Sequence, residues 1–126
     1  MKWMIASDIH GSAKYCRLML ERFAEEKADR LLLLGDILYH GPRNDLPEEY
    51  GPKQVISMLN PLKDKILCVR GNCDAEVDQM VLGFPIMADY LVVDFEGKTA
   101  YVTHGHHYNP SAPFPGVKNY ILMNDH

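Results

Sequence analysis

Four groups of polar residues that could do chemistry follow short apolar runs in this 126-residue chain. They are Asp8-Ile9-His10-Gly11, Gly35-Asp36, Gly71-Asn72-Cys73-Asp74 and Thr103-His104-Gly105-His106-His107. Carboxylate oxygens, imidazole nitrogens and an amide oxygen are together a ligand set for a divalent first-row metal such as Mn, Fe or Zn. The cysteines form no thiolate cage, so a structural zinc ribbon is not expected. These groups therefore predict a metal centre assembled from separate turns.

Each group taken alone has a simpler interpretation. An Asp-x-His pair is often a capped turn, Gly-Asp is a common turn, and Asn72 after Gly71 suits a turn as well as a ligand. The histidines at positions 104, 106 and 107 can also lie on the surface, so the residues alone assign only one of them as a ligand. All four groups follow predicted strands in order, and this coincidence favours the metal site.

Asp36 is the residue on which the chemistry of such a centre would depend. Its two carboxylate oxygens can bridge two cations. Two metals about 3.5–4 Å apart can activate a bridging hydroxide and clamp a phosphoryl group. The glycines beside the polar residues would let the backbone turn sharply next to the cations.

The hydrophobic pattern predicts the elements that would position these groups. Three short buried strands are expected at residues 2–7, 30–35 and 65–70. Helices are expected from Ser12 to about Lys27, from about Lys53 to Leu59 and near residues 74–81, with Ser12 as the first N-cap. The alternating order predicts βαβ units with right-handed crossovers, and ligands of such sheets bind outside the carboxyl ends of the strands.

The second half of the chain has a different pattern. The segments "YLVVDF" and "TAYVTH" flank a glycine-containing turn, so they predict a β-hairpin that would make the sheet mixed. Residues 41–52 and 108–116 are rich in proline and glycine and are expected to be loops, and one last strand is expected at 119–124. We expect an α/β fold and, because no repeat or linker interrupts the chain, a single domain over residues 1–126.

The composition disfavours several classes of protein. Its 13 Lys and Arg against 17 Asp and Glu give a formal net charge of −4, which argues against a nucleic-acid partner. No apolar run approaches the ~20 residues that cross a bilayer, so no membrane partner is expected. Cys16, Cys68 and Cys73 are an odd and widely spaced set, which disfavours a disulfide scaffold and favours the reducing cytoplasm.

The motifs "DIH", "GD", "GNCD" and "THGH", in this order, resemble those of the calcineurin-like metallophosphoesterases, a superfamily with a binuclear metal centre. Longer strings such as "LGDILYHGPRN" and "RGNCDAEVDQM" are similar to the bacterial YfcE-type phosphodiesterases. The likeness spans nearly the whole chain. It implies a mixed-sheet α/β fold, which is a four-layer αββα sandwich in the family, and this chain would hold mainly the N-terminal sheet with its helices.

The resemblance also implies a ligand set. Asp8 and His10 would bind the first metal, and Asp36 would bridge both metals. Asn72 and His104 would bind the second metal. The cofactors implied are two divalent cations, with Mn as the first expectation and Zn, Fe or Ni as alternatives.

Other matching residues would lie around the metals. Cys73 stands where many relatives have a catalytic histidine, and His106 would face the substrate beside it. Asp74 would orient a neighbouring histidine. Arg43 and Asn44, in the loop after the second strand, are candidates for substrate contacts, although Arg43 is equally well explained as a surface charge.

The chain departs from the family at its last motif. That motif is Gly-His-x-His, with one histidine for each metal, and strands of a second sheet follow it. Here the segment "NDH" would align with it, so that His126 takes the place of the first histidine and Asp125 replaces the glycine. We therefore expect a domain that is truncated before the last metal-binding motif and the second sheet, with His126 as a ligand at the chain end.

Formal charge favours a diester as the substrate. Two divalent cations, two carboxylates, one hydroxide and a diester monoanion cancel, whereas a monoester dianion would leave a negative charge that Cys73 cannot offset as an imidazolium could. We expect a phosphodiesterase that hydrolyses a small phosphodiester with a bridging hydroxide, and the resemblance also implies a possible homo-oligomer. The alternatives are a phosphomonoesterase or protein phosphatase, and an inactive fragment or protein-binding scaffold of the same fold.

Overall fold

The computed structural model describes residues 2–39, 47–95, 97–104 and 120–121. Within these segments the strands form two three-stranded sheets. The first sheet is parallel and has the order β1-β2-β3, with strands Trp3–Ala6, Arg30–Leu33 and Ile66–Cys68. The second has the order β4-β5-β6, with strands Leu91–Phe95, Lys98–Val102 and Tyr120–Ile121. The predicted α/β class and the three parallel strands are confirmed.

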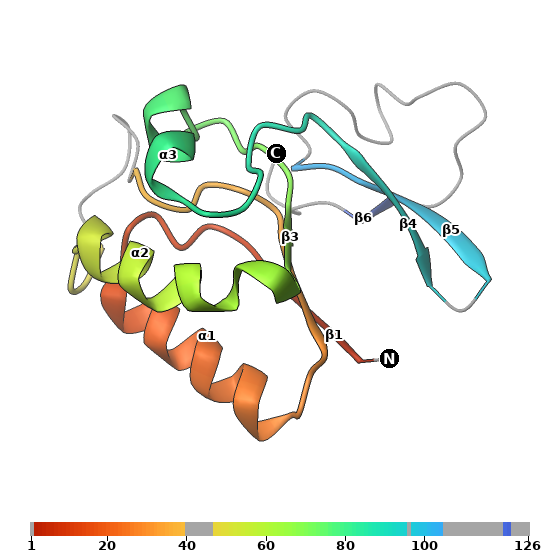
Figure 1. The fold of residues 1–126 in the computed structure, drawn as a ribbon, viewed down its shortest axis with the longest axis horizontal. Helices are drawn as coiled ribbons and strands as arrows, with labels where there is room; N and C mark the ends of the chain where they lie inside the picture. The colour runs from red at the N-terminus through yellow and green to blue at the C-terminus, as the bar shows by residue number, and fades with distance from the viewer. Residues whose placement is uncertain (1, 40–46, 96, 105–119, 122–126) are drawn as a thin grey trace.

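The crossover helices lie together on one side of the parallel sheet (Figure 1). Helix α1 spans Ala13–Glu25 and helix α2 spans Pro52–Leu59. The N-cap prediction at Ser12 is confirmed, because its side chain accepts a hydrogen bond of 3.2 Å from the Tyr15 N–H. A 3-10 helix over Asn60–Lys65 follows α2 and was not predicted, because a proline near the start of a helical turn ends α2 without ending helical geometry.

The four leucines at 31–34 are all buried. Three belong to the central strand β2 and lie on both of its faces, and Leu34 directly follows that strand. Leu31 and Leu33 belong to the core that includes residues of α1 and α2. Leu32 and Leu34 belong to a second core with residues of the β4–β5 hairpin. A strand covered on both faces needs apolar side chains at every position, which explains why this run shows no alternation.

The β4–β5 hairpin does not extend the parallel sheet, so the prediction that it joins that sheet is wrong, although the predicted mixed sheet is present. It forms a separate sheet in which β4 and β5 are antiparallel and β6 is parallel to β5. Val93, Val102 and Leu32 belong to one buried cluster, and the ring of Trp3 meets that of Phe95 edge-on with their centroids 5.1 Å apart. The second sheet thus begins at Leu91, whereas the resemblance implied that it follows the last metal-binding motif. Its hairpin covers the face of the first sheet opposite the helices (Figure 1).

The observed boundaries of the remaining elements agree closely with those predicted from the sequence. The short helix predicted near residues 74–81 is α3, Glu76–Val81. The loop predicted at 108–116 lies outside the described residues, as do the first half of the loop predicted at 41–52 and most of the strand predicted at 119–124. In the described part of the chain, no helix is both long and apolar enough to span a bilayer.

Candidate metal centre

The turns that follow β1 and β2 run side by side. The Asp8 N–H donates to the Gly35 carbonyl at 3.2 Å, and the His10 N–H donates to the Asp36 carbonyl at 2.9 Å. Asp8, His10 and Asp36 all have left-handed backbone conformations, with φ values of 60°, 49° and 56°. Each such residue costs about 1–2 kcal/mol. Backbone hydrogen bonds between the turns therefore hold three strained residues whose side chains can do chemistry.

The turn after β3 approaches the turn after β2 so closely that only glycine fits. A Cβ atom on Gly35 would overlap the backbone of Gly71. A Cβ atom on Gly71 would overlap the carboxylate of Asp36. The two glycines therefore allow the second and third polar groups to meet.

The buried side chain of Asp74 holds the turns after β2 and β3 together. Its carboxylate is buried and accepts hydrogen bonds from the N–H groups of Asp36 at 2.8 Å, Ile37 at 3.0 Å and Gly71 at 2.7 Å. The resemblance had implied that Asp74 orients a histidine. In the described residues it instead ties two turns together through backbone N–H groups, because three such donors converge where the strands end.

Asp36 lies at the centre of the arrangement and is 2% exposed. One carboxylate oxygen, Oδ1, accepts a hydrogen bond of 2.7 Å from the Cys73 N–H. The other, Oδ2, lies 3.3 Å from His104 Nε2 and 3.7 Å from His10 Nε2. Burial opposes ionisation of Asp36, but the hydrogen bonds from His104 and the Cys73 backbone outweigh it and lower the pKa of Asp36.

Both histidines present the same ring nitrogen to Asp36. His10 Nδ1 lies 2.9 Å from the Tyr39 carbonyl, and His104 Nδ1 lies 2.6 Å from the Leu34 carbonyl. A carbonyl oxygen only accepts, so Nδ1 carries the proton in each ring. In a neutral imidazole, Nε2 then carries no proton, and its lone pair faces a carboxylate. Such an arrangement is favourable only if the histidine gains a second proton or a cation lies between them.

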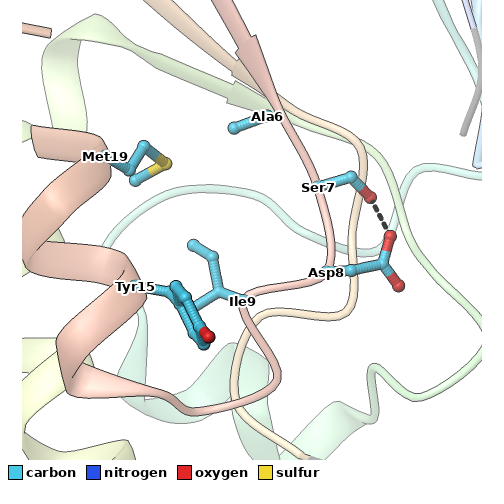
Figure 2. Close-up of a pocket in the computed structure, with 6 residues that line it drawn as sticks. All are labelled: Ala6, Ser7, Asp8, Ile9, Tyr15 and Met19. Carbon is cyan, nitrogen blue, oxygen red and sulfur yellow. Dashed lines mark hydrogen bonds between the residues drawn. The ribbon is translucent and has the colours of Figure 1, made fainter. Parts of the chain in front are cut away.

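Asp8 adds a second carboxylate to the same region. Its Oδ1 lies 2.9 Å from His10 Nε2, and its Oδ2 accepts a hydrogen bond of 2.6 Å from the Ser7 hydroxyl. Figure 2 shows this hydrogen bond at the edge of a cavity of about 340 Å³, with the carboxylate pointing away from Tyr15 and Met19. The Asp8 carboxylate is therefore available to the centre and not to the apolar wall of the cavity.

The donor atoms fall into two sets that share Asp36. Asp8, Asp36 and His104 each offer one atom, and these atoms lie within 4.8 Å of one another. His10, Asp36 and Cys73 do the same. Carboxylate oxygens with δ-protonated histidines fit divalent cations, so these residues fit the predicted metal centre.

Cys73 is half-buried at the rim of the centre. Burial, followed by the charges of Asp36, Asp74 and Asp8, raises the pKa of its thiol to about 11. Without a cation the thiol is therefore protonated at neutral pH and donates no negative charge to the centre.

The structure thus brings together five of the predicted site residues, and these are Asp8, His10, Asp36, Cys73 and His104. Asn72 is exposed in the same turn as Cys73. The other predicted site residues lie outside the described residues, and these are Arg43, Asn44, His106 and His126.

Sequence reasoning missed the supporting contacts. Ser7 precedes Asp8 and holds its carboxylate. The carbonyls of Leu34 and Tyr39 set the proton position on the two histidines. Backbone groups carry no residue-specific signal. Ser7, however, lies next to a predicted ligand and could have been considered from its hydroxyl alone.

The chain is similar in sequence to known phosphoesterases. The sequence profile described as a calcineurin-like phosphoesterase superfamily domain matches residues 1–119. "Phosphodiesterase YfcE" of Escherichia coli strain K12 is 52% identical over 126 residues, which are 100% of this chain and 68% of that protein. The protein of the same name from E. coli O157:H7 has the same identity and coverage.

Solved structures agree with this likeness. A structure described as YfcE, a phosphoesterase from E. coli, matches with a TM-score of 0.89 and 49% identity, and covers 94% of this chain. A structure described as a novel archaeal phosphodiesterase matches with a TM-score of 0.61 and 25% identity over 85% of this chain. This chain spans 64% of the first structure and 61% of the second.

Proposed function

The chain belongs to the calcineurin-like phosphoesterase superfamily, and from this membership we propose that it is a metal-dependent phosphodiesterase with a binuclear centre built on Asp36. The observation that supports the proposal most strongly is the convergence of His10 Nε2 and His104 Nε2 on one oxygen of Asp36, at 3.7 and 3.3 Å. Two divalent cations, when bound, would supply an activated water at neutral pH and neutralise charge on the phosphoryl group.

The residues would divide between two cation positions. We assign Asp8 and His10 to one position, His104 to the other and Asp36 to both. The exposed amide of Asn72 would complete the second position, as the resemblance implies. His126, which lies outside the described residues, remains a proposed ligand of the first position.

The protein groups would organise the centre before the substrate arrives. Asp74 holds the turns of Asp36 and Gly71 together, so Asp36 keeps its position when the ligand charge changes. The Leu34 and Tyr39 carbonyls hold Nδ1 of the two histidines and would leave both Nε2 lone pairs free to bind cations. This preorganisation is what electrostatic stabilisation of a phosphoryl group requires.

Charge favours a diester as the substrate. The centre holds two carboxylates, Asp8 and Asp36, and the neutral thiol of Cys73 stands where an imidazolium could offset a further negative charge. A monoanionic diester therefore matches two divalent cations and a hydroxide better than a dianionic monoester does. Cys73 and His106 would lie beside the phosphoryl group, and Arg43 and Asn44 would contact the rest of a small substrate.

Manganese is the cation we propose first, because carboxylate-rich centres with histidine suit it, and zinc, iron and nickel are alternatives. We also propose that residues 1–126 belong to one metallophosphoesterase domain, since the two sheets share one apolar layer. The three cysteines are free thiols, which supports a cytoplasmic location. A homo-oligomer is a further expectation, which sedimentation would test.

Metal-dependent turnover of an aryl phosphodiester tests the proposal. The chain should cleave bis(4-nitrophenyl) phosphate with added Mn²⁺ faster than it cleaves 4-nitrophenyl phosphate. Asp36→Asn should abolish this activity, whereas Asp64→Asn, which changes an exposed carboxylate of the 3-10 helix, should retain it. Faster monoester cleavage would favour a phosphomonoesterase, and metal binding without turnover would favour a scaffold.

A further inference from the structure

One of the two donor sets contains sulfur. A ring nitrogen of His10, a carboxylate oxygen of Asp36 and Sγ of Cys73 lie within 4.8 Å of one another. We propose that Cys73 is a ligand for thiophilic divalent cations, so that Zn²⁺, Co²⁺ or Cd²⁺ binds this centre through a sulfur that Mn²⁺ does not use. The inference rests on the proposed metal centre and adds to it a basis for discriminating between cations.

The geometry needs only a small adjustment. Zinc bonds of about 2.0–2.3 Å to nitrogen, oxygen and sulfur place tetrahedral ligand atoms roughly 3.6 Å apart. The three donor atoms lie within 4.8 Å of one another, so their separations exceed that value by at most a little more than 1 Å. The hydrogen bond of 2.7 Å from the Cys73 N–H to Asp36 Oδ1 holds the Cys73 backbone beside the carboxylate. Rotation of the half-buried side chain can then bring Sγ toward the cation.

The chemistry separates the cations. A thiolate is a soft ligand that suits zinc and cadmium, whereas Mn²⁺ prefers carboxylate, carbonyl and water oxygens. When the thiophilic ion binds, the S–H bond breaks, its electron pair forms the sulfur–metal bond, and the proton passes to solvent. Mn²⁺ would bind without the sulfur, and Cys73 would then lie beside the substrate.

The other two cysteines serve as matched controls. Cys16 is fully buried between α1 and the sheet, and Cys68 is 3% exposed in β3. Neither belongs to a donor set with His10 or Asp36 among the described residues. A sulfur signal from a bound ion would therefore report on Cys73.

Cobalt provides the test. The metal-free chain is titrated with Co²⁺, and the near-ultraviolet absorption is followed for a sulfur-to-cobalt charge-transfer band. The band should appear in the native chain and in Cys16→Ala, and should be absent in Cys73→Ser. In competition titrations, Cys73→Ser should weaken Zn²⁺ binding by about 10- to 100-fold or more. Loss of a residue that only supports a metal ligand already weakens metal binding by this amount, and Cys73 would be a direct ligand. Mn²⁺ affinity should not change.

A second measurement does not depend on the folding of a variant. X-ray absorption of the native chain with one equivalent of Zn²⁺ should show a sulfur neighbour at about 2.3 Å. Zinc with only nitrogen and oxygen neighbours, or cobalt that binds without the charge-transfer band, would refute the inference and leave the proposed centre intact. Failure of Co²⁺, Zn²⁺ and Mn²⁺ alike to bind would refute both the inference and the proposed metal centre. Sulfur ligation in a chain without Mn²⁺-dependent turnover would support the inference while the proposed function failed.

Discussion

Gly71→Ala should disturb the metal centre without changing any proposed ligand. A Cβ atom at Gly71 would lie 2.7 Å from Asp36 Cγ and 2.6 Å from the Asp36 backbone nitrogen. Ordinary contacts begin near 3.4 Å, so the turn must move by at least about 0.8 Å, and the carboxylate oxygen Oδ1, which would lie closer still, must move further. The movement would strain the hydrogen bond of 2.7 Å from Gly71 N–H to Asp74 and that from Cys73 N–H to Asp36.

The magnitude follows from these contacts. Overpacking in a well-packed region costs about 1–3 kcal/mol. Loss of one hydrogen bond to a charged group costs about 1.5–3 kcal/mol more. We therefore expect Gly71→Ala to lower the free energy of unfolding by about 2.5–6 kcal/mol, a large part of the roughly 5–15 kcal/mol typical of a domain. The affinity for Mn²⁺ should fall at least about tenfold, because Asp36 is displaced.

Urea unfolding and Mn²⁺ calorimetry would check both effects, with Gly83→Ala as the matched control. A Cβ atom at Gly83 would lie 3.4 Å from the flexible side chain of Lys63, so that substitution should be nearly silent. If Gly71→Ala and Gly83→Ala showed the same stability and the same Mn²⁺ affinity, the close approach of the two turns would not position Asp36.

Three further predictions follow from individual contacts. Ser12→Ala should lower the free energy of unfolding by about 1 kcal/mol in urea titrations, because it removes the N-cap of α1; an unchanged midpoint would show that the cap contributes nothing. In a chelator, the melting temperature should be highest between pH 3.8 and pH 6.5 and should fall as the pH rises beyond 6.5 and His104 loses its proton. Burial lowers the pKa of His104, but the hydrogen bond to Asp36 raises it above its ordinary value of 6.5, so this stabilisation is complete below that value and is lost as His104 deprotonates. The lowered pKa of Asp36 stabilises the protein above 3.8, its ordinary value, and this contribution is lost in acid. His104→Gln should abolish the decline above neutral pH, and a decline that persists in it would contradict the assignment. Cys73→His should raise monoester relative to diester turnover with Mn²⁺, since an imidazolium can offset the additional charge; a constant ratio would refute the charge argument.

The sequence predicted the parallel sheet because its signals are local. The leucine run at 31–34 and the polar residues that follow each strand mark the strand and its carboxyl end without any knowledge of packing. Ser12 marks the start of α1 in the same way. The convergence of Asp8 and Asp36 followed from the rule that strand ends of a parallel sheet meet at one edge. His104 follows β5 of the second sheet, so that rule does not explain its position.

The second sheet was misplaced because alternation gives a strand its faces but not its neighbours. Val93 and Val102 would form the same sequence pattern whether the hairpin lay at an edge or over a face of the sheet. The role of Asp74 was missed for a related reason. Its partners are three backbone N–H groups from two turns, and such donors are brought together only by the tertiary fold.

Crystals of the chain grown with Mn²⁺ would test the central claim most directly, through the anomalous signal of the metal. The account predicts two ions about 3.5–4 Å apart, one bound by each carboxylate oxygen of Asp36 or both bridged by one of them. Manganese that is absent, or bound without contact to Asp36, would contradict it.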